Sequence, residues 1–211
     1  MKEKTIQSFL DELSTDVPTL PGGGCALALS GALAASVEKF VLSINLKKLG
    51  EESENLVTTG AKILHRLQEL RLDCEELIEM DVRAYSEVIN AFKMPVKTET
   101  QKKARKSAVE EAFKSATEVP CKLMEYSLEM LTYAGNIVEN CYRALLADAG
   151  VALEVAHACF WGAFWISIAN LNEINDSEFV TEVSEKLDHF KKKEKRIYGK
   201  VREKLEELLK V

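Results

Sequence analysis

The sequence contains few of the residues that interrupt helices. Only 4 prolines and 10 glycines occur among 211 residues, and three of these glycines are consecutive, at 22–24. Because proline and glycine punctuate turn-rich folds, their scarcity favours long helices and disfavours a β-sandwich or a barrel. Hydrophobic residues make up 46% of the chain and charged residues 29%, as is typical of a globular domain with a core of its own. We therefore expect an all-α fold.

Apolar residues recur at helical spacing through most of the chain, and no segment alternates with a period of two for long enough to predict a strand. The predicted helices cover about Lys4–Leu13, Cys25–Lys48, Glu51–Phe92, Thr98–Ala134, Asn140–Leu171 and Asp176–Leu209. Residues 14–24 form the strongest predicted loop. Pro120 predicts a kink or a break within the fourth helix, and Gly135 predicts a further interruption. Asp176 or Ser177 is a suitable N-cap for the last helix.

No linker separates two hydrophobic cores in this sequence, and no repeat of fixed period is present. We therefore predict a single domain over residues 1–211, built as a bundle of about five to six long helices. The long predicted helices carry apolar residues on more than one face, and this pattern also predicts a homodimer.

Charge and composition argue against several classes of function. The chain has 28 basic and 34 acidic residues, a net charge of −6, whereas nucleic-acid binding needs a basic face. The start at Met1 leads into no apolar run, so no secretory signal is expected. The most apolar stretch, Ala144–Leu171, contains Asp148 and Glu154, and we expect no membrane span there. Five scattered cysteines, an odd number, predict reduced thiols in a cytoplasmic protein.

The first candidate binding element is the turn Pro21-Gly22-Gly23-Gly24 ahead of a predicted helix. Glycine lets a ligand approach the backbone, and the start of a helix offers unpaired N–H groups at a positive dipole end. Together they suit a carboxylate, a phosphate or a polarised carbonyl. The spacing matches neither the P-loop nor the dinucleotide-binding motif. A tight turn that lets two helices cross is the more common explanation of such a pattern.

Two aspartates, Asp81 and Asp148, occur in predominantly apolar helical surroundings. A buried carboxylate must be paired, raised in pKa or placed against a cavity, and such environments produce general acids and bases. The structural alternatives are a surface carboxylate paired with a cation for Asp81 and a salt bridge between helices for Asp148. Asn170, at the end of an apolar run, is either a ligand-binding group or the donor of a cap or interhelix hydrogen bond.

The remaining candidates fit structural roles better than chemical ones. His157 lies on an apolar face and is interpreted as a satisfied core histidine, and Cys25 is the only cysteine placed to be reactive. Trp161 and Trp165, one turn apart, predict a core or an interface. No spacing of His, Cys and Glu predicts a metal site. The run 191–196 predicts a solvated basic face, with attraction of a polyanionic tail as the alternative.

Several segments, taken in order, resemble the cyclodeaminase/cyclohydrolase family of formiminotetrahydrofolate cyclodeaminases and methenyltetrahydrofolate cyclohydrolases. The segments that carry the resemblance lie between about Thr5 and Phe179: Pro21–Gly24 with the small-residue helix after it, Asp81–Tyr85, Ala91–Pro95, Val119-Pro120, Asp148–Ala152 and Asn170-Leu171. The resemblance implies an all-α homodimer that binds a reduced folate in a cleft near the subunit interface, with no prosthetic group and no metal. It also implies one of two reactions, namely loss of ammonia from 5-formimino-tetrahydrofolate or hydration of 5,10-methenyl-tetrahydrofolate.

The same resemblance implies roles for the candidate residues. Asp81 and Asp148 are the catalytic carboxylates, because the methenyl bridge is cationic and a carboxylate beside it stabilises charge and activates water.

The substrate-binding residues that the resemblance implies are Pro21, Gly22, Gly23, Gly24 and Asn170, with the glycine turn donating N–H groups to the pterin or to the glutamate tail. The stretch 141–147 lacks the asparagines that family members usually carry ahead of the second aspartate. The alternative is therefore a catalytically inactive member that serves as a ligand-binding or protein-interaction helical dimer.

Overall fold

The computed structural model describes residues 4–15, 21–49 and 54–210, and all regular secondary structure in this part of the chain is helical, without strands. The elements are α1 (Ile6–Leu13), α2 (Gly23–Leu49), α3 (Glu54–Phe92), α4 (Glu99–Glu139), the short 3₁₀ helix η1 (Arg143–Leu145), α5 (Leu146–Leu171) and α6 (Ser177–Leu209). The predicted all-α class is confirmed, and the six α-helices of the described residues agree with the expected number. Part of the predicted loop, 16–20, and the predicted helix start at Glu51 lie outside the described residues.

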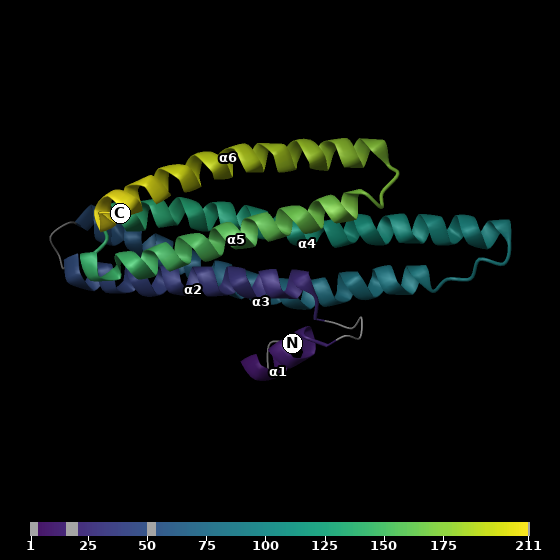
Figure 1. Cartoon of the computed structure of the whole chain (residues 1–211), viewed down its shortest axis with the longest axis horizontal. Helices are drawn as coiled ribbons and strands as arrows, with labels where there is room; N and C mark the ends of the chain where they lie inside the picture. The colour runs from purple at the N-terminus through teal and green to yellow at the C-terminus, as the bar shows by residue number, and fades with distance from the viewer. Residues whose placement is uncertain (1–3, 16–20, 50–53, 211) are drawn as a thin grey trace.

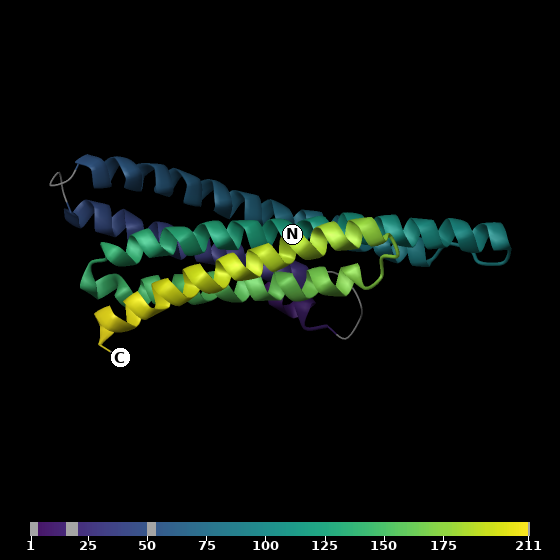
Figure 2. The ribbon, with the colours of Figure 1, turned by 90° about the horizontal axis from the view of Figure 1, so that it is seen from above.

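Helices α2, α3, α4 and α5 pack against one another, and α6 lies along α4 and α5 (Figure 1). The core follows the long axis as two main clusters, one containing Met124 and Phe160 and the other containing Leu131 and Leu153. The end of α3 and the beginning of α4 project past the other helices at one end of the bundle (Figures 1 and 2). This projecting end becomes one wall of the cavity described below.

Helices α2 and α5 are apolar around most of their circumference, because other helices pack against them on several sides. By length and composition alone, the stretches 23–48 and 143–171 would be apolar enough to cross a membrane. Buried residues make up 50% and 44% of their most apolar windows, as expected for helices at the centre of a bundle.

Helix α4 runs without a break through both Pro120 and Gly135, so the break that was one alternative at Pro120 and the interruption predicted at Gly135 are wrong. Proline has no N–H, so the carbonyl of Ala116 one turn earlier loses its intrahelical donor. The side chain of Asn170 on α5 replaces that donor, with Nδ2 3.1 Å from the Ala116 oxygen. An interhelix hydrogen bond therefore offsets the bond that Pro120 removes.

The helix ends follow local capping chemistry in most places. Thr98 and Gln101 form a capping box at the start of α4, and Asp176 accepts two backbone N–H bonds at the start of α6, as predicted. The start of α5 was predicted at Asn140, but the chain turns there and passes through η1 before α5 begins at Leu146.

Candidate functional site

A cavity of about 600 Å³ lies between α3, α4, α5 and the start of α2. Five of the sequence-predicted site residues line it: Gly22, Gly23, Gly24, Asp81 and Asn170. They come from the beginning of α2, the middle of α3 and the end of α5, which are far apart in the sequence. The bundle therefore brings most of the predicted site together.

The Asp81 carboxylate is half-buried and lies against the first turn of α2. Its Oδ2 accepts a hydrogen bond from the Cys25 thiol, with 3.2 Å between sulfur and oxygen, and the Cys25 backbone N–H also donates to it. Burial raises the pKa of Asp81, and the two Cys25 donors oppose this rise because they favour the ionised form. No cation pairs with Asp81 among the described residues, so the surface ion-pair alternative does not apply. These are the surroundings of a proton-transfer group rather than of a structural ion pair.

Gly24 makes room for this arrangement. A Cβ atom at position 24 would overlap the Asp81 carboxylate, whereas one at Gly22 would meet nothing within 4 Å. Gly24 does not adopt the left-handed backbone conformation. Glycine is therefore needed at position 24 for space, since it lets a carboxylate from α3 reach the N-terminus of α2.

Cys25 has a different role from the one that its position suggested. Its side chain is fully buried, and burial, as the main cause, raises the pKa of the thiol to about 12. A thiol that keeps its proton is a poor nucleophile, so the position of Cys25 beside the glycine turn does not make it reactive. The same proton makes Cys25 a permanent hydrogen-bond donor to Asp81.

The far wall of the cavity is aromatic and was not anticipated as a site. Tyr85, Val88 and Phe92 follow Asp81 on the cavity side of α3, and Phe113 faces them from α4. The rings of Phe92 and Phe113 meet edge to face, with 6.1 Å between their centroids. The signal was present in the sequence, because these α3 positions are three or four residues apart and so share a face.

Asn170 combines its two predicted roles, since it lines the cavity and also donates the hydrogen bond to α4. Pro21 is buried just ahead of α2 and does not line the cavity. Glu173, which sequence reasoning missed, adds a second carboxylate to the lining. It lies just beyond the end of α5, where no periodic pattern marks it.

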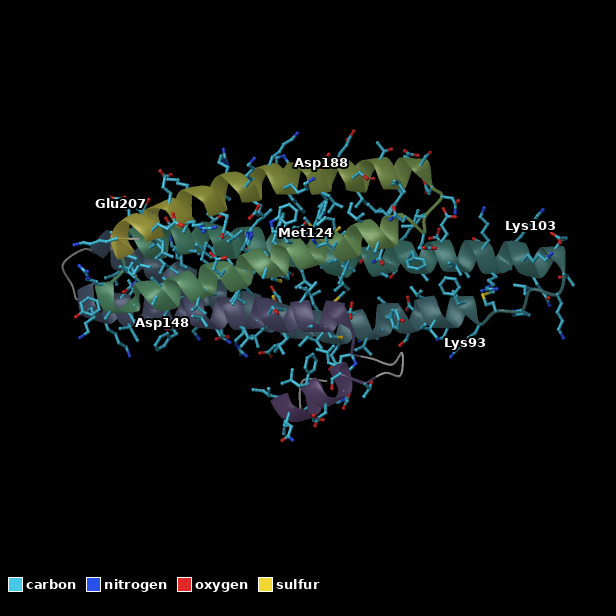
Figure 3. The ribbon with its side chains drawn as sticks, viewed as in Figure 1. Lys93, Lys103, Met124, Asp148, Asp188 and Glu207 are labelled. Atoms are coloured by element: carbon cyan, nitrogen blue, oxygen red, sulfur yellow. The ribbon has the colours of Figure 1, made fainter. Side chains whose placement is uncertain are left out.

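Asp148 does not reach this cavity. It lies in the first turn of α5, whereas Asn170 lies near the end of the same helix, about 33 Å away at 1.5 Å per residue. Figure 3 shows Asp148 at the end of the bundle opposite to Lys93 and Lys103. No ion pair involves Asp148 among the described residues, so the interhelix salt bridge considered as its structural alternative is absent there. The expectation that both aspartates converge on one cavity is wrong within a single chain.

The other candidate residues contribute to the packing of the helices. His157 is satisfied, as predicted, because its Nδ1 lies 2.6 Å from a buried oxygen of Glu194 and its ring stacks on Tyr198. Trp161 is partly buried, while Trp165 is 62% exposed on α5. Among the residues that the structure describes, no group of three or more His, Cys, Asp or Glu side chains is placed to hold a metal ion.

Comparison with known proteins places these features in context. Residues 5–189 match the profile of the family described as formiminotransferase-cyclodeaminase. A methenyltetrahydrofolate cyclohydrolase of Methylorubrum extorquens is 33% identical over 187 residues, which cover 88% of each chain. A formimidoyltransferase-cyclodeaminase of Gallus gallus is 29% identical over 171 residues, which make up 78% of this chain and 30% of that protein.

The crystal structure of a formiminotetrahydrofolate cyclodeaminase from Thermotoga maritima has the same fold. It superposes with a TM-score of 0.86 and 23% sequence identity, covering 99% of this chain and 98% of that one.

Proposed function

Because the chain belongs to the formiminotransferase-cyclodeaminase family, which contains enzymes of folate one-carbon metabolism, we propose that it hydrates 5,10-methenyl-tetrahydrofolate to 10-formyl-tetrahydrofolate. The observation that carries this proposal is the Asp81 carboxylate, which lies unpaired by any cation in a 600 Å³ cavity. A carboxylate in that position stabilises a cationic methenyl carbon and accepts a proton from attacking water.

The proposed reaction needs only proton transfers around one carbon. Water adds to the methenyl carbon between N5 and N10, and Asp81 takes the proton that the water loses. The bond from this carbon to N5 then breaks, Asp81 returns its proton to N5, and the hydroxyl group on the carbon releases its proton to solvent as it becomes the formyl C=O on N10. A carboxyl whose pKa is raised by burial is suited to both transfers, because it gains and loses a proton closer to neutral pH.

The second candidate reaction is the cyclodeaminase reaction, which the names of other relatives favour. In this reaction N10 attacks the formimino carbon, Asp81 takes the N10 proton, and the same proton leaves with ammonia. The intermediate again has a tetrahedral carbon between two nitrogens. One carboxylate therefore serves either reaction, and the substrate distinguishes them.

A direct assay decides between these reactions. We expect the absorbance of 5,10-methenyl-tetrahydrofolate to decay faster with the protein than in buffer, and 5-formimino-tetrahydrofolate to release ammonia only if the second reaction occurs. If neither signal appears but calorimetry shows that a reduced folate binds, the protein is a non-catalytic, folate-binding member of the family. Neither turnover nor binding would refute the proposed function.

We further propose a homodimer, because two adjacent helices expose large apolar side chains. Val151 and Trp165 on α5 are 54% and 62% exposed, and Leu33 and Phe40 on α2 are 53% and 51% exposed. Exposed apolar groups of this size on neighbouring helices are typical of an interface. A second copy of the chain would remove them from water.

A two-fold axis near Ala158 would also explain the position of Asp148. Val151 and Trp165 each lie seven residues from Ala158, so an axis perpendicular to α5 at that point pairs each valine with the other chain's tryptophan. The same symmetry brings the partner's Asp148 to about residue 168, between Ile166 and Asn170 of the cavity lining. The second predicted carboxylate would then reach the site from the other subunit.

Sedimentation velocity tests the dimer. We expect Trp165→Glu to yield folded monomers, because an unpaired charge buried in the interface opposes association. The matched control is Leu72→Glu at an exposed leucine of α3, which we expect to leave the sedimentation coefficient unchanged. A dimeric Trp165→Glu protein would contradict this placement of the interface.

A further inference from the structure

The charge of the cavity lining limits how an anionic substrate can lie in it. The lining includes two carboxylates, Asp81 and Glu173, and no lysine, arginine or histidine. Tetrahydrofolates carry the one-carbon unit at the pterin end and a glutamate with free carboxylates at the other end. Beside Asp81 the cationic carbon is stabilised, whereas the glutamate would meet like charge. The tail therefore needs cations outside the cavity.

The shape of the cavity gives it a direction. Asp81, Tyr85, Val88 and Phe92 line it from one face of α3, and the first and last of these are about 16 Å apart along the helix axis. Asp81 lies against the glycine turn at one end of the cavity, and Phe92 with Phe113 forms the aromatic end. A flat, elongated ligand with its reactive carbon at Asp81 would leave the cavity past Phe92.

A basic segment begins directly beyond Phe92. Residues 93–106 connect α3 to α4 and form the first two turns of α4, at the projecting end of the bundle. They contain six lysines and arginines and one glutamate, although the whole chain has a net charge of −6. Figure 3 shows Lys93 and Lys103 on this projecting end. Lys102 pairs with Glu99, and the other five cations have no carboxylate partner among the described residues.

Arg105 connects this segment to the cavity. It is partly buried, and its guanidinium carbon lies 5.6 Å from the centroid of the Phe92 ring, which lines the cavity. Arg105 also lies two turns before Phe113 on α4, on the same side of that helix. An unpaired guanidinium at the mouth of an acidic, aromatic cavity is suited to bind a carboxylate.

We propose that Arg105, supported by the lysines of residues 93–106, binds the glutamate carboxylates of the substrate. The substrate then lies along α3, with its one-carbon unit at Asp81, its aromatic linker between Phe92 and Phe113, and its tail on the projecting end. This assignment rests on the proposed function, and it makes the start of α2 the pterin end of the site.

The test compares substrates with and without the tail. For 5,10-methenyl-tetrahydrofolate, we expect Arg105→Gln to raise KM about three- to tenfold and to leave kcat nearly unchanged, because a partly exposed charge pair is lost. For the amide of 5,10-methenyl-tetrahydropteroate, which lacks the glutamate and has no free carboxylate, KM should be the same for both proteins. Added salt should raise KM for the glutamate substrate in the unmodified protein and have less effect in the variant.

The matched control is Lys195→Ala, which removes an exposed cation from α6, a helix that does not line the cavity. We expect this variant to leave both KM values unchanged, and Arg105→Lys to retain part of the dependence on the tail. An equal rise of KM for both substrates in Arg105→Gln, or no rise, would overturn the tail assignment alone. Absence of turnover with every tetrahydrofolate would overturn the proposed function and this inference with it.

Discussion

Asp81 and Asp148 have similar neighbours in the sequence and different surroundings in the fold. Both lie on helices between apolar residues, yet of the two only Asp81 lines the 600 Å³ cavity, where burial raises its pKa. Asp148 lies in the first turn of α5, at the end of the bundle (Figure 3). Apolar neighbours along one helix therefore do not determine what a carboxylate faces. The element packed against the helix determines it, and for Asp81 this element is the glycine-rich start of α2.

The largest expected difference between the two carboxylates is catalytic. We expect Asp81→Asn to lower kcat at least about 100-fold, because the amide cannot carry a proton between water and N5. The same change should increase the free energy of unfolding at neutral pH. Since folding raises the pKa of Asp81, its ionisation opposes folding above that pKa, and the neutral amide avoids this cost.

Methenyl-tetrahydrofolate hydrolysis and urea denaturation of the same Asp81→Asn preparation measure these two effects. Full activity would remove Asp81 from the mechanism. Lower stability would show that the carboxylate is structural.

The next prediction concerns the space that Gly24 leaves for the Asp81 carboxylate. We expect Gly24→Ala to lower kcat about 10- to 100-fold, because the new methyl group overlaps the Asp81 carboxylate and must displace it. Gly22→Ala, two residues away, meets nothing within 4 Å and should retain activity. Circular dichroism and steady-state kinetics of the pair test this prediction. Equal losses in both variants would indicate that the turn matters for its backbone rather than for the carboxylate.

The difference between these two regions also explains what the sequence predicts well. The helices follow from apolar periodicity and from the few breakers, and Asp176 caps α6 as its chemistry dictates. The glycine turn, Asp81 and Asn170 were identified because each is unusual in its local surroundings. Such anomalies are visible without knowledge of tertiary contacts.

The misses depend on contacts between helices. A break of α4 at Pro120 was one predicted alternative, but the helix continues and a donor on α5 compensates for the missing N–H. Phe92 and Phe113 look like ordinary core residues until α3 and α4 are seen to extend together past the other helices. Asp148 matched the local pattern of a site residue, and its distance from the cavity follows only from the length of α5. No local pattern contains this information.

A third experiment asks whether Asp148 acts from the other subunit. We expect Asp148→Asn alone to lower kcat about tenfold, less than the loss at Asp81, because it would orient groups rather than transfer the proton. After subunit exchange between Asp81→Asn and Asp148→Asn proteins, half of the dimers are mixed and each mixed dimer has one intact site. Activity should then rise to about a quarter of the unmodified value. No recovery on mixing would confine both residues to their own chains.

A smaller effect concerns the bond between Asn170 and α4. We expect Asn170→Ala to lower the free energy of unfolding by about 1–2 kcal/mol, because the Ala116 carbonyl loses the donor that replaces the missing N–H of Pro120. In a Pro120→Ala background the helix supplies its own donor, so the same change should cost less. Urea denaturation of the two single variants and the double variant gives the coupling free energy between Asn170 and Pro120. Additive effects would show that the two residues are independent.

The smallest effect concerns the hydrogen bond that sets the proton affinity of Asp81. Cys25→Ala removes the thiol donor and should raise the pKa of Asp81 further, because that bond favours the ionised carboxylate. Hydration needs Asp81 as a base, and the base form exists only above its pKa. The acidic limb of the pH–rate profile should therefore move to higher pH, so that kcat falls on the acidic side of the profile and stays unchanged on its alkaline plateau.

Cys25→Ser separates this effect from one of packing, because the hydroxyl still donates to Asp81 while the side chain loses its sulfur. We expect the serine variant to keep the pH–rate profile of the unmodified protein. Since the pKa of the Cys25 thiol is about 12, donation to Asp81 persists across the measured range and the thiol contributes no inflection of its own. An acidic limb at the same pH in the alanine and serine variants would mean that burial and the backbone N–H of Cys25 set the proton affinity of Asp81 without the thiol.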